Sequence, residues 1–392
     1  QIILMIFLFK LIIFTLLSPL KKIITPKNII ILSSNSAYRY GGGPRYLFEH
    51  LSKKGFNVYW WTRDKNIQKF LKKKRLKYFS ISNLFLFFKI IFLTKIVINS
   101  GNDHFDFCNL LRKDKRIKKI CTGHGFGIKT VNEIKTDSIN RNFDHVSYPS
   151  EFTAKYIAQK EFRIDTNKVN IFGNPKNDLF LNKFRVNNIY NNKKIVKFYI
   201  KKFDKKSKVI FYAPTWRPYK SALPLLSLKK FDLKKFDLFL RKNNFYFFYN
   251  FHISSNSKNI LDTERIKFIS NKSFPLLDTN EMLCECDIFC TDCSTLSTEA
   301  AILKKPQILI FPDYKKYDQV KGFVEPFDKI IPGNIIYDFN LFMKKLNLYK
   351  KEKTYTKKFH KKITKYLDHY YDIKINNSSA RHEKLITRLL KD

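Results

Sequence analysis

Short apolar runs recur along most of the chain, and segments with helical patterning separate them. In the first half these runs cover residues 28–34, 58–62, 95–100, 117–122, 145–149 and 169–173. A second set covers residues 208–214, 245–252, 266–270, 287–292 and 307–313. Buried strands that alternate with helices are typical of a parallel sheet covered by helices on both faces. The pattern therefore predicts an α/β fold with two Rossmann-like, doubly wound domains and a ligand near the carboxyl ends of the strands.

Helix and linker signals divide the chain further. Pro44 stands near the start of a helical segment and Gly55 just past its end. The polar stretch 187–208 is the expected linker between the two sets of strands, and beyond Gly333 the chain is expected to be helical and basic. These signals predict four parts, namely a hydrophobic helix (1–22), an N-terminal Rossmann-like domain (23–190), a C-terminal Rossmann-like domain (191–350) and basic C-terminal helices (351–392).

Residues 2–20 form the longest apolar stretch, and Lys21 and Lys22 follow it directly. A bilayer core needs about 20 apolar residues, so this stretch is long enough to span a membrane. Lysines on its C-terminal side favour a cytoplasmic location for the rest of the chain. We expect either a single-span anchor or a helix that lies on the membrane surface, with a hydrophobic patch packed on the domain as the alternative.

The formal charge of +42 raises the question of anionic partners. The lysines are scattered along the whole chain, and no basic run interleaves with aromatic residues as in a nucleic-acid module. Abundant Lys, Asn, Ile and Phe also share A/T-rich codons. We therefore predict no nucleic-acid partner, although a basic protein that binds membranes or nucleic acid without catalysis stays open as an alternative.

Four cysteines cluster in the segment CECDIFCTDC, at positions 284, 286, 290 and 293. Their spacing is not that of a paired-knuckle zinc site, and residues 287–290 have the pattern of a buried strand. Free cysteine is commonly a small buried residue. We predict neither a metal site nor a cofactor.

The segment KKICTGHGFGIKT, residues 118–130, contains three of the 11 glycines of the chain. Glycine permits backbone conformations that other residues resist, so a tight turn is expected where the strand ends. That turn would present His124 at the edge of the sheet, where an imidazole can accept a proton from a hydroxyl. Lys129 would add positive charge for a phosphate. A structural turn with an incidental histidine is the alternative.

In the segment IFCTDCSTLSTEAA a strand runs into Ser294 and Thr295 at the expected start of a helix. Hydroxyls and free N–H groups at a helix start can bind phosphate. Glu299 lies about one turn further, where its carboxylate can accept hydrogen bonds from ribose hydroxyls. Simple capping of the helix by Ser294 would need only one of these residues.

Three further strand ends carry candidate residues. Arg217 follows the strand of FYAPTWRPY and can bind a phosphate or carboxylate with two parallel hydrogen bonds, although a surface arginine stacked on Trp216 fits equally well. Asn174 and Lys176 lie in the turn GNPKND, which by itself is ordinary. His252 ends the strand of FYNFH and could reach the same site or lie exposed.

Taken in order, these segments resemble the CDP-glycerol glycerophosphotransferase family of teichoic acid and capsule synthesis. The family's HGTPLK, GxPRND, ILYAPTWR and TDYSS segments correspond here to HGFGIK, GNPKND, IFYAPTWR and TDCST, with a strand-end histidine between the last two. The early segment YRYGGGPRYLFEHL is similar to the family's NPKYLYEYL region. The ordered set, over roughly residues 28–335, is more specific than any single motif.

This resemblance implies a bacterial enzyme of GT-B architecture, in which the N-terminal domain (23–190) handles the acceptor and the C-terminal domain (191–350) handles the CDP-linked donor. It would transfer glycerol phosphate, ribitol phosphate or a related alditol phosphate from a CDP-linked donor to a lipid-linked or polysaccharide acceptor, with release of CMP. A GT-B glycosyltransferase that uses a nucleotide sugar is the alternative enzyme. The resemblance implies that His124 is the general base and that His252 assists phosphate transfer. The implied donor-binding residues are Arg217, Ser294, Thr295, Glu299 and Lys321. The implied phosphate or acceptor contacts are Lys129, Asn174 and Lys176.

Three positions depart from the family pattern. Gly123 stands where relatives often have tryptophan, Thr295 replaces the second serine of the donor motif, and Lys321-Gly322 stands where relatives have Arg-Gly. A lysine lacks the planar, two-pronged contact of an arginine guanidinium. The pattern therefore leaves the donor open between CDP-glycerol, CDP-ribitol and another nucleotide-linked group.

Overall fold

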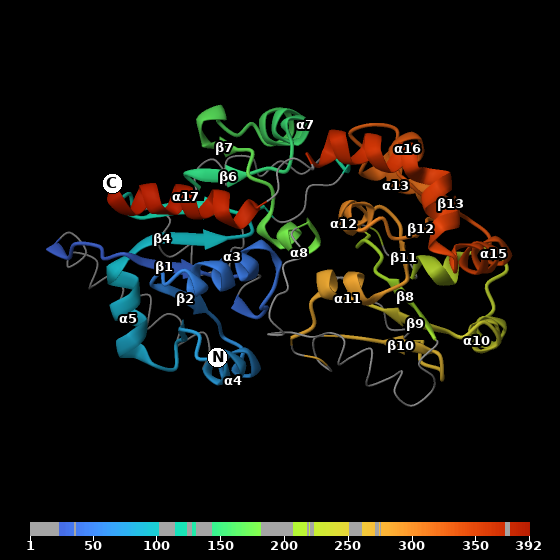
Figure 1. The fold of residues 1–392 in the computed structure, drawn as a ribbon, viewed down its shortest axis with the longest axis horizontal. Coiled ribbons are helices and arrows are strands. Elements are labelled where there is room, and N and C mark those ends of the chain that lie inside the picture. The colour runs from blue at the N-terminus through green and yellow to red at the C-terminus, as the bar shows by residue number, and fades with distance from the viewer. Residues whose placement is uncertain are drawn as a thin grey trace.

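The computed structural model contains two parallel β-sheets, each covered by helices on both faces (Figure 1). It describes residues 23–34, 37–101, 114–123, 128–130, 143–181, 207–217, 219, 223–250, 261–270, 274, 276–372 and 377–392. The predicted hydrophobic helix, and the predicted linker apart from residues 207–208, lie outside these residues. Two Rossmann-like sheets confirm the predicted α/β fold.

The first sheet has the strand order β3-β2-β1-β4-β5-β6-β7, and all of its strand pairs are parallel. Its strands are β1 (Ile29–Leu32), β2 (Val58–Trp61), β3 (Tyr78–Phe79), β4 (Thr94–Asn99), β5 (Lys118–Cys121), β6 (His145–Ser147) and β7 (Val169–Asn170). The apolar runs predicted six of these strands. β3 was missed because it is very short and lies at the sheet edge.

The second sheet has the order β10-β9-β8-β11-β12-β13, again with parallel pairs only. Its strands are β8 (Lys208–Tyr212), β9 (Phe245–Tyr249), β10 (Ile266–Phe268), β11 (Ile288–Thr291), β12 (Gln307–Ile310) and β13 (Asn334–Ile336). The prediction that the chain is helical beyond Gly333 is wrong at β13. This short edge strand pairs with only one neighbour, β12, and an isolated three-residue run carries little periodic signal.

In the described part of the chain, helices lie between most successive strands, as parallel pairing requires. Those of the first half are α3 (Gly42–Lys53), α4 (Lys65–Lys73), α5 (Leu84–Leu93), α7 (Glu151–Thr153), η3 (Ala154–Glu161), η4 (Thr166–Lys168), η5 (Pro175–Asn177) and α8 (Asp178–Leu181). Those of the second half are η6 (Pro224–Ser227), α10 (Leu233–Lys242), α11 (Thr279–Glu285), α12 (Leu296–Ile302), α13 (Tyr314–Val320), α14 (Phe327–Ile330), α15 (Phe339–Tyr349), α16 (Glu352–Tyr370) and α17 (Ser378–Lys391).

Aspartate side chains begin several of these helices. Asp64, Asp232 and Asp338 each accept a hydrogen bond from a backbone N–H in the first turn of α4, α10 and α15, respectively. The first N–H groups of a helix have no partner within the helix, so a short acidic side chain at this position both satisfies a donor and meets the positive end of the helix dipole.

Alternation along β1 explains how the first sheet buries both faces. Ile30 and Leu32 belong to one apolar cluster, whereas Ile29 and Ile31 belong to another on the opposite face. The same alternation along β8 divides Ile210 and Tyr212 from Val209 and Phe211. Successive side chains of a strand point to opposite faces, so each sheet forms the middle layer of a three-layer domain.

The two C-terminal helices belong to different sheets. α16 contributes Tyr355, Phe359 and Ile363 to the core of the second sheet. α17 returns to the first sheet, where its Leu385 and Ile386 are buried with residues of β1, β2 and α3 (Figure 1). The sequence predicted the helices but not this return, which makes the C-terminus part of the N-terminal core.

Within the described part of the chain, no helix has the length and apolar character that a membrane span needs. The stretch 2–20, which carries the predicted anchor, lies outside the described residues.

Candidate active site

Both sheets reverse their strand order at one point, between β1 and β4 in the first and between β8 and β11 in the second. Connections leave in opposite directions there, and the resulting crevice at the carboxyl ends of the strands is where ligands bind in such folds. Arg217 follows β8, and Ser294 and Thr295 follow β11. The three residues predicted from separate motifs therefore come to one switch point.

Arg217 is buried at this switch point, and two aspartates bind its guanidinium. Nε and Nη2 donate to the two carboxylate oxygens of Asp313 at 2.7 and 2.9 Å, and Nη1 donates to Oδ2 of Asp292 at 2.5 Å. Its Cζ also lies 5.1 Å from the ring centroid of Phe311. The alternative of a surface arginine stacked on Trp216 is wrong, because Arg217 is only 8% exposed and packs on other rings.

Asp292 joins the ends of β8 and β11. Its carboxylate accepts hydrogen bonds from the backbone N–H of Thr215 at 2.9 Å and of Cys293 at 2.6 Å, in addition to that from Arg217. Carboxylates that accept several such bonds hold adjacent turns in one conformation. The sequence had not assigned Asp292 or Asp313 to the site.

Ser294 and Thr295 are half-buried and lead into α12. Ser294 precedes the N-cap residue Thr295, and its hydroxyl accepts a weak hydrogen bond of 3.3 Å from the N–H of Leu296, the first residue of α12. Thr295 stands at the N-cap position without a capping bond from its side chain. Its hydroxyl is therefore not used to begin the helix.

Lys176 and Glu299 were both predicted to contact ligands, and they contact each other. Nζ of Lys176 in η5 lies 2.7 Å from Oε1 of Glu299 in α12, and both side chains are buried. The other carboxylate oxygen, Oε2 of Glu299, is buried and has no hydrogen-bond partner among the described residues. A buried acceptor without a donor is costly, so this oxygen is suited to bind a ligand hydroxyl.

Lys129 and Lys321 lie on either side of a direct contact between the domains. Lys129 forms an isolated antiparallel bridge with Phe323, and the N–H of Val324 donates to the carbonyl of Ile128 at 2.7 Å. The hydroxyl of Thr130 donates to the carbonyl of Lys321. Residues 128–130 are thereby attached to the second domain.

Asn174 contacts Gly123, the residue before His124. Its side-chain amide donates to the carbonyl of Gly123 at 3.1 Å, and Gly123 has a φ of 79°, which favours glycine. A Cβ at Gly43 of α3 would stand 2.5 Å from Oδ1 of Asn174, so this close approach requires a glycine. His124 and His252 lie outside the described residues, and their roles stay predictions.

An ionic cluster around Arg45, which joins the two domains, was not predicted. The fully buried Arg45 of α3 donates to Glu49 at 3.0 Å, to Asp278 at 2.9 Å and to Glu281 at 2.6 Å, and the last two residues begin α11. The PRYLFEHL segment shows the Arg45–Glu49 spacing, but nothing in the sequence indicates the distant partners.

In this Arg45 cluster one arginine contacts three carboxyl groups, and the pKa values of Asp278 and Glu281 are shifted in opposite directions. Burial raises the pKa of Glu281 to about 8, because Arg45 compensates it only in part. Burial also acts to raise the pKa of Asp278, but Arg45, Arg39 and hydrogen bonds from Asn280 outweigh it and lower that pKa. Burial therefore opposes ionisation of Glu281, whereas the neighbouring cations favour ionisation of Asp278.

The four clustered cysteines are free thiols. Cys286, Cys290 and Cys293 are buried, as the apolar strand pattern indicated, and burial raises the pKa of Cys286 and Cys293 to about 12. No group of three or more His, Cys, Asp or Glu suited to a metal ion exists in the described ranges. The prediction that no metal or cofactor is needed remains a prediction.

Comparison with known proteins gives a consistent result. A family model described as CDP-Glycerol:Poly(glycerophosphate) glycerophosphotransferase matches residues 15–387. The teichoic acid glycerol-phosphate primase of Bacillus subtilis is 28% identical over 267 residues, which cover 64% of each chain. The teichoic acid glycerol-phosphate transferase of Staphylococcus aureus is 24% identical over 343 residues, 79% of this chain and 81% of the relative. The chain thus spans less than two thirds of the primase.

Among solved structures, the wall teichoic acid polymerase TagF superposes with a TM-score of 0.72 at 19% identity, over 93% of this chain and 89% of the other. Such a likeness at low identity concerns the fold. It confirms the predicted arrangement of two Rossmann-like domains, the GT-B architecture.

Proposed function

The chain belongs to the CDP-glycerol:poly(glycerophosphate) glycerophosphotransferase family, and from this premise we propose that it transfers glycerol phosphate or a related alditol phosphate from a CDP-linked donor to an acceptor hydroxyl. The acceptor would be a lipid-linked or polymeric phosphate chain of the bacterial cell envelope. CMP is the second product. We further propose that the reaction takes place at the cytoplasmic face of the membrane, on the basis of the apolar stretch 2–20.

The contact between Lys129 and Phe323 carries this proposal. It ties the segment that follows the predicted base to the domain that holds the Ser294–Thr295 helix start. In a transferase of two substrates the acceptor hydroxyl and the donor phosphate must meet in a fixed geometry. A backbone bridge between an acceptor-side loop and the donor domain supports such a geometry.

The proposed chemistry needs one proton transfer and one displacement. His124 accepts the proton of the acceptor hydroxyl, whose oxygen forms a bond to the phosphorus that carries the alditol. The bond from that phosphorus to the CMP oxygen breaks, and CMP leaves with the electron pair. His252 assists the transfer. Phosphoryl transfer relies chiefly on positioning and on neutralisation of charge, which Lys129 and Lys321 supply.

On the donor side we propose that Ser294 and Thr295 bind the pyrophosphate and that Oε2 of Glu299 accepts a hydrogen bond from ribose. The support is the unpartnered, buried state of that oxygen. Arg217 acts through Asp292, because its strongest contacts are with the two aspartates that hold the ends of β8 and β11. Its influence on the donor is thus one of positioning.

The test is nucleotide release by the purified chain with CDP-glycerol, CDP-ribitol and nucleotide sugars, each with and without a lipid-linked acceptor. The proposal expects CMP from a CDP-alditol and an acceptor that grows by one alditol phosphate per CMP. Release of a nucleotide from the sugars alone would establish the glycosyltransferase alternative instead.

A matched pair of variants separates catalysis from binding. His124→Ala should abolish CMP release and leave CDP-glycerol binding intact, because an imidazole that acts as base is not needed to hold the donor. Glu299→Gln should weaken donor binding and preserve the chemistry. Full turnover by the His124→Ala variant would show that another group accepts the proton.

A further inference from the structure

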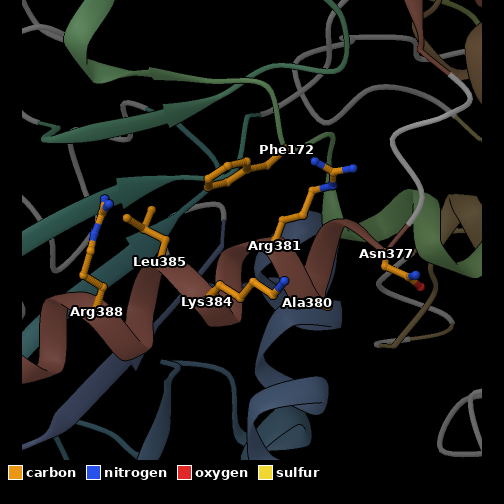
Figure 2. Close-up of a pocket in the computed structure, with 7 residues that line it drawn as sticks. All are labelled: Phe172, Asn377, Ala380, Arg381, Lys384, Leu385 and Arg388. Atoms are coloured by element: carbon orange, nitrogen blue, oxygen red, sulfur yellow. The ribbon is translucent and has the colours of Figure 1, made fainter.

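A pocket of about 550 Å³ lies beside α17, away from the contacts that join the two domains. Figure 2 shows that one face of the helix forms its floor and that Phe172 faces the helix across the pocket. The lining residues are Phe172, Asn377, Ala380, Arg381, Lys384, Leu385 and Arg388. Neither the predicted nor the observed site contacts use these side chains.

Three cations line this pocket at helical spacing. Arg381, Lys384 and Arg388 are exposed, and they stand at positions i, i+3 and i+7 along about 10 Å of helix axis. No acidic residue in the described ranges forms an ion pair with them, whereas the nearby Glu383 pairs with His50 at 2.6 Å. Three uncompensated charges on one face repel one another, so a bound polyanion would stabilise them.

The apolar lining is recessed. Phe172 is half-buried, with its ring 5.3 Å from that of His382 in an edge-to-face arrangement, and Leu385 is 4% exposed. A surface helix that enters a membrane instead presents protruding apolar side chains. A narrow chain that alternates anionic and carbon segments fits a recessed apolar floor with cations around it.

A short segment of the chain connects the pocket with the predicted acceptor side of the site. Two residues after Phe172, the side-chain amide of Asn174 donates to the carbonyl of Gly123, the residue before His124. Asp178 in the same segment accepts hydrogen bonds of 2.7 Å from the N–H groups of Ser378 and Ser379 and so fixes the start of α17. One short segment therefore contacts both Gly123 and the start of the pocket helix.

We propose that this α17 pocket binds the phosphodiester chain of the acceptor, upstream of the hydroxyl that reacts. Arginine binds phosphate oxygens with two parallel hydrogen bonds, and the alditol carbons would lie on Phe172 and Leu385. The inference rests on the proposed function, since only an enzyme that extends such a chain needs a subsite for it.

The test is equilibrium binding of a soluble poly(glycerol phosphate) chain to the Arg381→Gln/Lys384→Gln/Arg388→Gln variant. We expect its affinity to fall about tenfold or more at low salt, and the slope of log K against log salt to fall by about 2. The exposed lysines of α16 give a control with the same loss of charge, Lys353→Gln/Lys357→Gln/Lys361→Gln, which should bind as the wild type does.

Equal binding by the two triple variants would overturn the proposal, because total charge alone would then explain the affinity. So would an unchanged affinity for the chain combined with lost sedimentation on vesicles of phosphatidylglycerol and phosphatidylcholine, which would assign the pocket to a membrane. A failure of the proposed function gives a different result. In that case the wild type would release no CMP from any CDP-alditol, but the α17 variant would still bind the phosphate chain more weakly than the wild type and the α16 variant do.

Discussion

Buried cations between the two sheets and exposed cations on α17 differ in their partners. Between the sheets, Arg45 contacts three carboxylates and Lys176 contacts Glu299. Arg217, at the carboxyl end of the second sheet, contacts two aspartates. On α17, three cations line a pocket, namely Arg381, Lys384 and Arg388. None of them has an acidic partner in the described ranges.

The difference shows which positive charges can be assigned to ligands. The chain has 75 Lys and Arg against 33 Asp and Glu, so most cations cannot be paired. The buried carboxylates gather where arginines would otherwise be buried without compensation, which would be costly. Pairing therefore identifies structural cations, and a concave surface with unpaired cations identifies a binding region.

The largest expected effect is on stability at Arg45. Arg45→Met should lower the free energy of unfolding by about 3–5 kcal/mol, because it leaves buried carboxylates without their cation. Arg381→Met, the matched change on α17, should alter it by less than about 0.5 kcal/mol. Chemical denaturation of both variants measures the two values, and similar losses would remove the distinction between the regions.

A smaller effect is expected at Arg217. Arg217→Lys keeps the charge but cannot contact both oxygens of Asp313 and one of Asp292, so stability should fall by about 1–3 kcal/mol and CMP release should slow. Arg388→Lys should leave the stability nearly unchanged, because this side chain is exposed and forms no ion pair within the described ranges. Thermal unfolding and nucleotide release test the pair.

Glu281 should make the Arg45 cluster sensitive to pH. Its pKa is raised to about 8 in the folded chain, so the folded state retains a proton that the unfolded state releases above about pH 4.5. Stability from this group is present at low pH and is lost as pH rises from about 4.5 to 8. Glu281→Gln cannot ionise, and its unfolding midpoint should fall less over this range than that of the wild type.

The helix α17 should respond to pH in the opposite direction. His382 is buried between Ser147 and the carbonyl of Ser378, and burial lowers its pKa to about 4. The unfolded chain binds a proton below about pH 6.5, so stability is lost as pH falls from there toward 4. His382→Gln should reduce this loss, measured as hydrogen exchange of α17 between pH 6.5 and 4.5.

Local sequence patterns predicted those features of the structure that depend on residues close together in the chain. Apolar runs identified the central strands of both sheets, and strand ends identified Arg217 and Ser294 because parallel strands bring their carboxyl ends together. The edge strands β3 and β13 were not predicted, because a strand of two or three residues shows no periodicity of apolar and polar positions. The sequence also suggested Lys176 and Glu299 singly as ligand contacts.

Long-range pairing is what the sequence could not provide. Contacts such as Arg45 with Asp278, or Lys176 with Glu299, depend on how the two sheets lie against each other, and no local spacing encodes that. The α17 pocket could have been suggested by the i, i+3, i+7 spacing of its cations. Its significance appears only once α17 is seen to return to the first sheet.

The most direct test of the distinction between paired and unpaired cations is the KM for a poly(glycerol phosphate) acceptor during CMP release. The triple glutamine variants of α17 and α16 each remove three exposed charges. We predict a KM raised about tenfold or more in the α17 variant only, with the KM for CDP-glycerol unchanged in both. Equal acceptor KM values in the two variants would contradict the account.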